Sequence, residues 1–283
     1  MGRRNQSSYI EAVIEDVCGE LGLAVPPPID SGVVIDPGPK TADSIVENME
    51  RSIDEGRSAT LSDVTDINRC AVIVPNYAAF AGTIKKLKQK SPCLRGGLKN
   101  RDVSLYVGFH FNGKSNEIPF EIQMQDPLLH RIKHYIADVN YRKTRRLTSL
   151  TIKAAREGLN KKEKELLITE QQEYEFRCKQ ERRLFTMLRE ATDINDHVEE
   201  ISSLIKYCNG IGDVNCEPEG REPYSPLLHD WQYCDKKGNL DEPKLRRAIG
   251  VLNPYLVSEQ KALCKRAKEP IRSCGVILPF GKY

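Results

Sequence analysis

The chain has 283 residues, 39% of them hydrophobic, and a formal net charge of +3 at pH 7. This length and apolar content suffice for a substantial folded core and exclude a chain that is disordered throughout. No stretch approaches the roughly 18 apolar residues of a membrane span, and the N-terminus lacks the apolar segment of a secretory signal. We therefore expect a soluble, cytoplasmic protein without a membrane partner.

Charge is unevenly distributed along the chain. Residues 11–66 carry thirteen acidic and three basic residues, whereas residues 67–101 carry eight basic residues and no acidic one. The basic stretches KKLKQK at 85–90 and YRKTRR at 141–146 are candidates for binding polyphosphate or nucleic acid, although lysine-rich helix faces usually only contact solvent. Nine cysteines without a CxxC pair predict reduced, structural thiols.

Residues 1–37 are expected to form an N-terminal helix and a linker. Apolar residues recur at helical spacing from Tyr9 to Leu21, after which Gly22 and three prolines end the helix. A short helix is expected from Ser44 to Ile53.

Residues 38–150 are predicted to form an α+β core, a mixed β-sheet flanked by helices. The β-branched run from Ala71 to Val74 predicts a buried strand, and residues 77–90 predict a helix. A basic loop, 91–101, then leads into a hairpin. The order strand, helix, strand, strand is typical of α+β proteins.

The hairpin, RDVSLYVGFHFNGKSNEIPFEIQMQ at 101–125, alternates apolar and polar residues in both arms, and Asn112-Gly113 reads as its turn. The apolar positions are Val103, Leu105, Val107, Phe109 and Phe111, then Ile118, Phe120, Ile122 and Met124. If these faces pair together, the opposite face collects Tyr106, His110, Glu121 and Gln123. That face is either a functional site or a solvated sheet surface.

The remaining chain is predicted to be a helical extension, 151–208, and a tail of unknown role, 209–283. Asp126-Pro127 begins a helix whose stripe, Leu129, Ile132, Ile136 and Val139, is expected to pack on the apolar side of the hairpin. Asn160 and Glu163 form a capping box for a longer helix. The tail ends in the possible strand GVILP.

Asp66 stands just before the buried strand and Arg69 three residues later, near the sheet edge where ligands commonly bind. With Glu121, Asp66 would hold Mg²⁺, which prefers a few carboxylates plus substrate phosphates. Structural alternatives remain open: Asp66 caps the turn, Asp63 is the functional acid, or Arg69 simply pairs with a carboxylate.

Four segments occur in a characteristic order: PGPKTADSI with Lys40 ahead of a Ser-Ile helix, the Asp-led strand TDINRCAVIV, YVGFH with Tyr106 four residues before His110, and the Glu-x-Gln strand FEIQMQ. This order resembles the RelA/SpoT nucleotidyltransferase domain, the alarmone synthetase superfamily. The resemblance covers about residues 38–145. It implies a nucleotidyltransferase-like fold for the core.

The sequence departs from the housekeeping members of that family, which have a Gly between the metal Asp and the Arg and an NGY before the His segment. The shorter spacing from Asp66 to Arg69 is similar to divergent members found in toxin–antitoxin systems and secreted effectors. An antitoxin or immunity protein is then a possible partner, and the target-cell cytoplasm a possible location. The family's hydrolase domain is not expected, because the one His-Asp pair, His229-Asp230, lies far downstream.

The resemblance implies transfer of a pyrophosphoryl group from ATP to the 3′-hydroxyl of a purine nucleotide, releasing AMP. Asp66 and Glu121 would hold Mg²⁺, or Glu121 would instead take the hydroxyl proton. Tyr106 would stack on the acceptor base, and Gln123 would orient Glu121. The phosphates would meet Arg69, Lys40 and His110.

Three functions follow from this interpretation. The first is synthesis of a (p)ppGpp- or (p)ppApp-like small nucleotide. The second is a toxin that pyrophosphorylates the 3′ end of tRNA, favoured by the basic segments. The third is a catalytically inactive nucleotide-binding regulatory module, favoured by the departures from the family pattern.

Overall fold

The computed structural model describes residues 3–54, 56, 60–61, 64–91, 94–101, 106–115, 118–210, 233–235 and 237–273. The chain divides into two compact units. One comprises residues 1–31, 99–108 and 126–197, and the other comprises residues 32–98, 109–125 and 198–283. The predicted strand GVILP and the pair His229-Asp230 lie outside the described residues.

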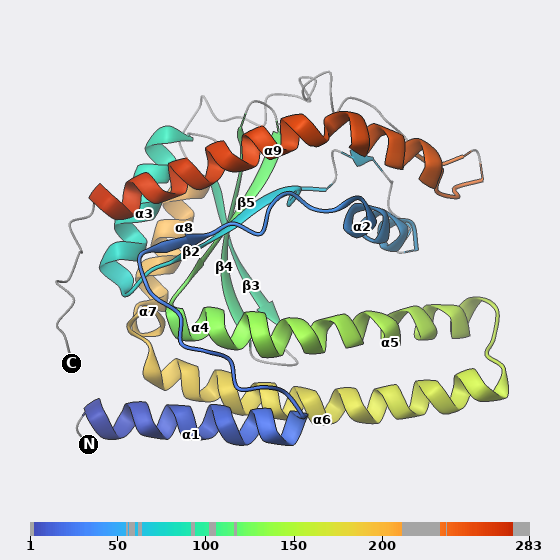
Figure 1. Cartoon of the computed structure of the whole chain (residues 1–283), viewed down its shortest axis with the longest axis horizontal. Coiled ribbons are helices and arrows are strands. Elements are labelled where there is room, and N and C mark those ends of the chain that lie inside the picture. The colour runs from blue at the N-terminus through green and yellow to red at the C-terminus, as the bar shows by residue number, and fades with distance from the viewer. Residues whose placement is uncertain are drawn as a thin grey trace. The chain divides into compact units, whose positions relative to one another are not determined.

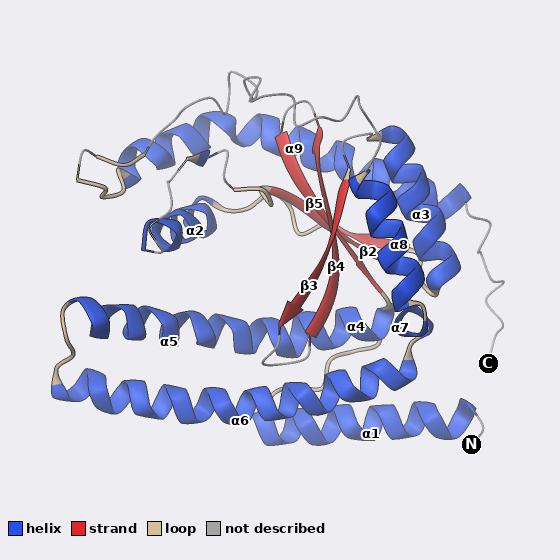
Figure 2. Ribbon diagram, turned by 180° about the vertical axis from the view of Figure 1, so that it is seen from behind, coloured by secondary structure: helices blue, strands red, loops and turns tan. Residues whose placement is uncertain are grey.

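The first unit is helical. Its helices are α1 (Arg3–Leu21), α4 (Pro127–Ile132), a π-helical turn (Lys133–Ala137), α5 (Asp138–Arg156), α6 (Lys161–Ala191) and the short α7 (Asp193–Asp196). Helices α1, α5 and α6 run alongside one another (Figure 2). The predicted capping box of Asn160 and Glu163 is confirmed at the start of α6.

The core of the helical unit corrects one packing prediction. Leu129, Ile132 and Ile136 are buried, as expected, but they pack with apolar residues of α1 and α6 in one cluster. Val139 is only partly buried. An apolar stripe shows that a helix face is buried, but not which element covers it. The expected packing of this stripe on the hairpin was therefore wrong.

Asp126 caps the N-terminus of α4, where its Oδ1 accepts a hydrogen bond of 2.8 Å from the backbone N–H of Leu129. Burial raises the pKa of this carboxyl to about 6, against backbone hydrogen bonds that lower it. The pKa of Asp126 in the folded state exceeds its usual 3.8, so the folded state binds the carboxyl proton more tightly than the unfolded chain does. This contribution to the free energy of unfolding is present below pH 4 and is lost as pH rises from about 4 to about 6.

We therefore expect Asp126→Asn, which keeps the cap, to stabilise the protein at pH 7.5 by up to about 3 kcal/mol and to have little effect below pH 4. Urea unfolding of both proteins at the two pH values measures this. Asn160→Asp at the exposed cap of α6 is the control, since it should change stability by less than about 1 kcal/mol. A gain that is equal at both pH values, or a loss at pH 7.5, would contradict the assignment.

The second unit holds a five-stranded mixed sheet in the order β1-β2-β5-β4-β3. Its strands are β1 (Val33–Ile35), β2 (Asn68–Ile73), β3 (Arg95–Arg101), β4 (Tyr106–Ser115) and β5 (Ile118–Gln125). β2 and β5 are parallel, whereas β1 with β2 and β4 with β5 are antiparallel. The predicted α+β class with a mixed sheet flanked by helices is confirmed.

The other helices of this unit are α2 (Ala42–Asp54), α3 (Tyr77–Lys90), α8 (Val198–Asn209) and α9 (Glu242–Ser273). Helix α9 runs across the sheet, with α3 and α8 near its C-terminal part (Figure 1). The phenyl ring of Phe80 on α3 packs edge-on against Phe109 and Phe111. The apolar side of the hairpin is thus covered by this unit's own helices.

The hairpin register follows the predicted alternation, with Phe109 opposite Met124 and Phe111 opposite Ile122. The predicted turn at Asn112-Gly113 was wrong, because both residues lie inside β4. Position 113 is instead restricted to a small residue by packing, because a Cβ atom there would lie 2.6 Å from the Phe120 ring. A further prediction fails, because residues 91–101, expected to form a loop, contain strand β3. In the tail, for which no helix was predicted, the structure shows the long helix α9.

None of the helices in the described part of the chain combines the length and apolar character that crossing a membrane requires. The six cysteines described carry free thiols, as expected, and all of them except Cys234 are buried. Cys70 of β2 and Cys264 of α9 share a hydrogen bond. This hydrogen bond, together with burial, raises the pKa of the Cys70 thiol.

Candidate functional site

The strand pairing gathers polar side chains on the sheet face opposite to Phe109 and Phe111. Arg69 of β2 stands opposite Glu121 of β5, because paired residues project to the same side of a sheet. On the other side of β5, His110 pairs with Gln123 and Asn112 pairs with Glu121. Register alone therefore brings four predicted site residues, His110, Arg69, Glu121 and Gln123, onto one face.

Glu121 lies at the centre of this face and is only 3% exposed. Its Oε1 accepts a hydrogen bond of 2.7 Å from Nε2 of Gln123, whose own Oε1 accepts one of 3.2 Å from Gln125. Its Oε2 lies 3.0 Å from Nδ1 of His110. Gln123 thus donates to the carboxylate while His110 lies beside it, which is the contact that the predicted orienting role of Gln123 requires.

Lys40 and Asp66 meet across 26 positions of sequence, with 2.5 Å between Nζ and Oδ1. The backbone N–H of Lys40 donates to the carbonyl of Ile67 at 2.8 Å, so the two segments are also joined through the main chain. Burial lowers the pKa of the Lys40 amine, while the carboxylates of Asp66 and Glu121 oppose this effect and Arg69 adds to it. These four side chains therefore form one electrostatic cluster.

Several buried polar atoms in the cluster have no hydrogen-bond partner among the described residues: Nε of Arg69, Nε2 of His110 and Oδ1 of Asn112. Nδ1 of His110 also lacks an aligned hydrogen bond, despite its short distance to Glu121. A buried polar atom without a partner costs about 1–3 kcal/mol, so these atoms call for a partner such as water, an ion or a ligand.

Two predicted residues cannot be placed by side chain. Tyr106 begins β4, but its side chain is outside the described part of the structure, and so is the whole of Asp63. Asp66 is placed, in the turn before β2, with its side chain 26% exposed. The ion pair with Lys40 places Asp66 in the cluster, which favours Asp66 over Asp63 as the functional acid.

The fit of Mg²⁺ can be judged from the donor atoms. Asp66 offers a partly exposed carboxylate and Glu121 a buried one, and both act on the same Lys40 amine. Within the described ranges, no group of three or more His, Cys, Asp or Glu side chains is arranged to hold a metal. Mg²⁺ does not require one, because it keeps several waters and binds one or two carboxylates with substrate phosphates. The donor set therefore suits Mg²⁺, with Asp66 the more accessible ligand.

No family model, curated protein or solved structure matches this chain. The resemblance to RelA/SpoT nucleotidyltransferases therefore stays a prediction. What the structure adds is geometric: five residues taken from three of the quoted segments, together with His110 from the fourth, lie in one cluster or on one sheet face. Those five are Lys40, Asp66, Arg69, Glu121 and Gln123.

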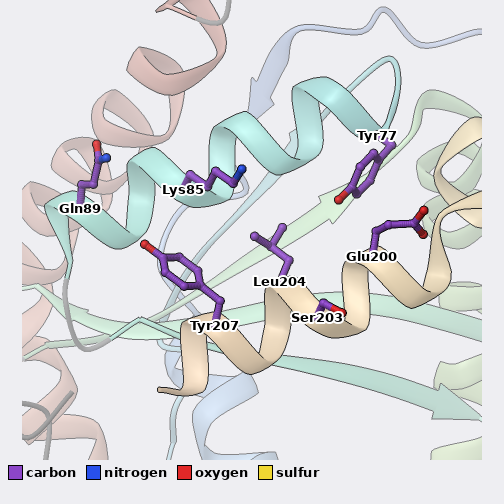
Figure 3. Close-up of a pocket in the computed structure, with 7 residues that line it drawn as sticks. All are labelled: Tyr77, Lys85, Gln89, Glu200, Ser203, Leu204 and Tyr207. Carbon is purple, nitrogen blue, oxygen red and sulfur yellow. The ribbon is translucent and has the colours of Figure 1, made fainter. Parts of the chain in front are cut away.

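In the unit that holds the sheet, a separate groove of about 390 Å³ lies between α3 and α8. Figure 3 shows Tyr77 and Tyr207 on either side of Leu204, with Lys85 and Glu200 at the walls. Its lining includes none of the predicted site residues. The groove is open and carries both charges, so it gives no indication of a particular ligand.

The two basic segments are less free to bind nucleic acid than their sequence suggests. Lys88 is buried and donates to the carbonyl of Cys208 at 3.1 Å, and Lys90 forms an ion pair with Glu269. In the other segment, Lys143 forms an ion pair of 2.6 Å with Glu173, and Arg145 stacks on the Tyr141 ring. Structural contacts thus engage at least four of the eight predicted phosphate-binding residues.

Sequence reasoning missed Gln260 and Asp36, which belong to the same network. The alternation does place Gln125 on the polar face of β5, and its side chain donates to Gln123, although it was not among the predicted site residues. Gln260 contacts Arg69 from 191 positions away, and no local pattern signals such a contact.

Proposed function

We propose that this chain is an ATP-dependent pyrophosphokinase that transfers a pyrophosphoryl group to the 3′-hydroxyl of a purine nucleotide. The observation that supports it is the cluster of Lys40, Asp66, Arg69 and Glu121, which combines cations for phosphates with carboxylates for a metal and a proton. The order in which the chain supplies these residues is that of the RelA/SpoT motifs.

In this reaction the acceptor oxygen attacks the β-phosphorus of ATP. The bond between that phosphorus and the oxygen bridging to the α-phosphate breaks, and AMP leaves with the bridging oxygen. The hydroxyl proton passes to Glu121. Each carboxylate oxygen has two lone pairs, so Glu121 can accept this proton while Gln123 and His110 hold it in place.

The cations have a separate role, since negative charge shifts among the phosphate oxygens as the reaction proceeds. Lys40 supplies a compact ammonium and Arg69 a planar guanidinium that binds two phosphate oxygens at once. His110 lies on the same face, where its Nε2 has no hydrogen-bond partner among the described residues. Fixed donors in a buried site stabilise such charge more than water does.

Asp66 would hold Mg²⁺, which would neutralise part of the triphosphate charge; in the alternative role, Glu121 would be a second ligand instead of the base. In the structure Asp66 is paired with Lys40, so this lysine would also orient the carboxylate. Lys40 and Asp66 would then both act on the triphosphate of ATP.

A small-nucleotide acceptor is favoured over tRNA, because half of the basic residues expected to contact tRNA already make intramolecular contacts. Incubation with ATP labelled at the γ-phosphate and with GTP, GDP, ATP, ADP or bulk tRNA tests this. We expect label on a purine mononucleotide and little on tRNA. Label on tRNA alone would replace the small-nucleotide assignment by the tRNA toxin, and label on none would favour a regulatory nucleotide-binding module.

A further inference from the structure

The edge of β2 next to the candidate site has an unusual partner. β1 pairs with β2 from Val33 opposite Ile73 to Ile35 opposite Ala71. Continued by two residues, this register would place Pro37 opposite Arg69. Proline has no backbone N–H, so it cannot extend the ladder as a donor. The main-chain N–H and C=O of Arg69 on this edge need another partner.

That partner is the side-chain amide of Gln260, on α9. Its Oε1 accepts from the Arg69 N–H at 3.1 Å, and its Nε2 donates to the Arg69 carbonyl at 2.7 Å. The amide therefore makes the pair of bonds that a neighbouring strand residue would make. Gln260 is 2% exposed, so the arrangement is protected from water.

The same amide also reaches the segment that carries Lys40. Nε2 of Gln260 donates to Oδ1 of Asp36 at 2.8 Å, and this oxygen also accepts from the backbone N–H of Gly38 at 2.8 Å. Gly38 has φ +74°, a conformation that suits glycine and turns the chain toward Lys40. One side chain thus ties the Lys40 segment to the Arg69 strand.

We propose that Gln260 is a positioning residue: it fixes the register of Arg69 against the Asp36–Lys40 segment and so sets both cations for a triphosphate ligand. The choice of triphosphate rests on the proposed function. Under this proposal, helix α9 carries the residue that positions Arg69, so it is part of the candidate site and not a separate module.

Gln260→Glu is the sharpest test, because it preserves volume and the acceptor for the Arg69 N–H but replaces the donor by an oxygen. That oxygen would face the Arg69 carbonyl and the Asp36 carboxylate. Asp36→Asn in the same chain restores a donor between positions 36 and 260. Asn253→Asp, at an exposed position on the same helix, is the matched control.

Three measurements are made on the full chain: amide hydrogen exchange of the β2 peptide, binding of ATP and inorganic triphosphate, and kcat with KM for transfer. We expect Gln260→Glu to speed exchange in β2, to weaken triphosphate binding, and to lower kcat about 10- to 100-fold with its far-UV spectrum retained. The double variant should recover at least part of each loss, and Asn253→Asp should match the wild type.

The outcomes separate the positioning role from the proposed function. If the wild type binds triphosphate without transferring it, and Gln260→Glu loses that binding, the positioning role stands and the pyrophosphokinase assignment falls. Faster exchange with unchanged binding and kcat would reduce Gln260 to a structural contact and overturn the inference. Wild-type protein that binds neither ATP nor triphosphate would overturn both.

Discussion

Glu121→Gln is expected to lower the rate of pyrophosphoryl transfer by about a hundredfold or more and to leave the fold intact. The substitution preserves the size of a buried side chain and the acceptor for Gln123, whose hydrogen bond to Oε1 is 2.7 Å. It removes the negative charge that accepts a proton or binds Mg²⁺. Single-turnover rates at saturating ATP, with far-UV spectra of both proteins, measure the effect.

Glu200→Gln is the control, because Glu200 lines the separate groove between α3 and α8. It should leave the rate within about twofold of the wild type. If Glu121→Gln also stays within a few-fold, the polar face of β5 is not the catalytic site. If it unfolds the protein, Gln123→Ala tests the same point, since it frees one oxygen of Glu121 and should lower kcat more than it raises KM.

Asp66→Asn is expected to reduce transfer by a similar factor, since it removes both the accessible metal ligand and the ion pair with Lys40. The pH profile should also change. Asp66 raises the pKa of Lys40 against the effect of burial, so without it the pKa of this amine falls further. Lys40 then loses its proton at a lower pH, and the alkaline limb of the rate profile moves down in pH.

Asp63→Asn is the comparison that separates the two acids, because the proposed mechanism assigns the metal and the ion pair with Lys40 to Asp66. It should retain near-normal activity and an unshifted alkaline limb. A large loss in Asp63→Asn with a normal rate in Asp66→Asn would show that the neighbouring acid carries the function.

The parts of the fold that were predicted correctly are those with a strong local pattern. The two-residue alternation of the hairpin identified which side chains share a face, because a slip of one residue would have exposed Phe109 and Phe111. The helix at residues 77–90 was predicted with the bounds it has in the structure. The local patterns Asp126-Pro127 and Asn160 with Glu163 also identified the helix caps at Asp126 and Asn160.

The errors have physical causes. β3 has the sequence RGGLKNR, which lacks β-branched residues, and it forms at the edge of an existing sheet. Helix α9 contains Gly250 and Pro254, which act as breakers in isolation, but packing of its apolar residues with those of α2 outweighs them.

The candidate site was predictable only in part. Alternation placed His110, Glu121 and Gln123 together, and the segment order suggested Lys40, Asp66 and Arg69. The contact of Gln260 with Arg69 spans 191 positions and depends on how α9 lies on the sheet, so no pattern in a single sequence identifies it. Contacts of this kind become visible only when the tertiary structure is known.

The most direct test of the central claim is the identity and stoichiometry of both products. ATP labelled at either the α- or the γ-phosphate is incubated with the best acceptor, and all nucleotides are separated and counted. The proposed reaction predicts one AMP from the α-label for each acceptor that gains a 3′-diphosphate from the γ-label, with both lost in Glu121→Gln. ADP in place of AMP, or AMP released with free pyrophosphate and no labelled acceptor, would contradict pyrophosphoryl transfer at this site.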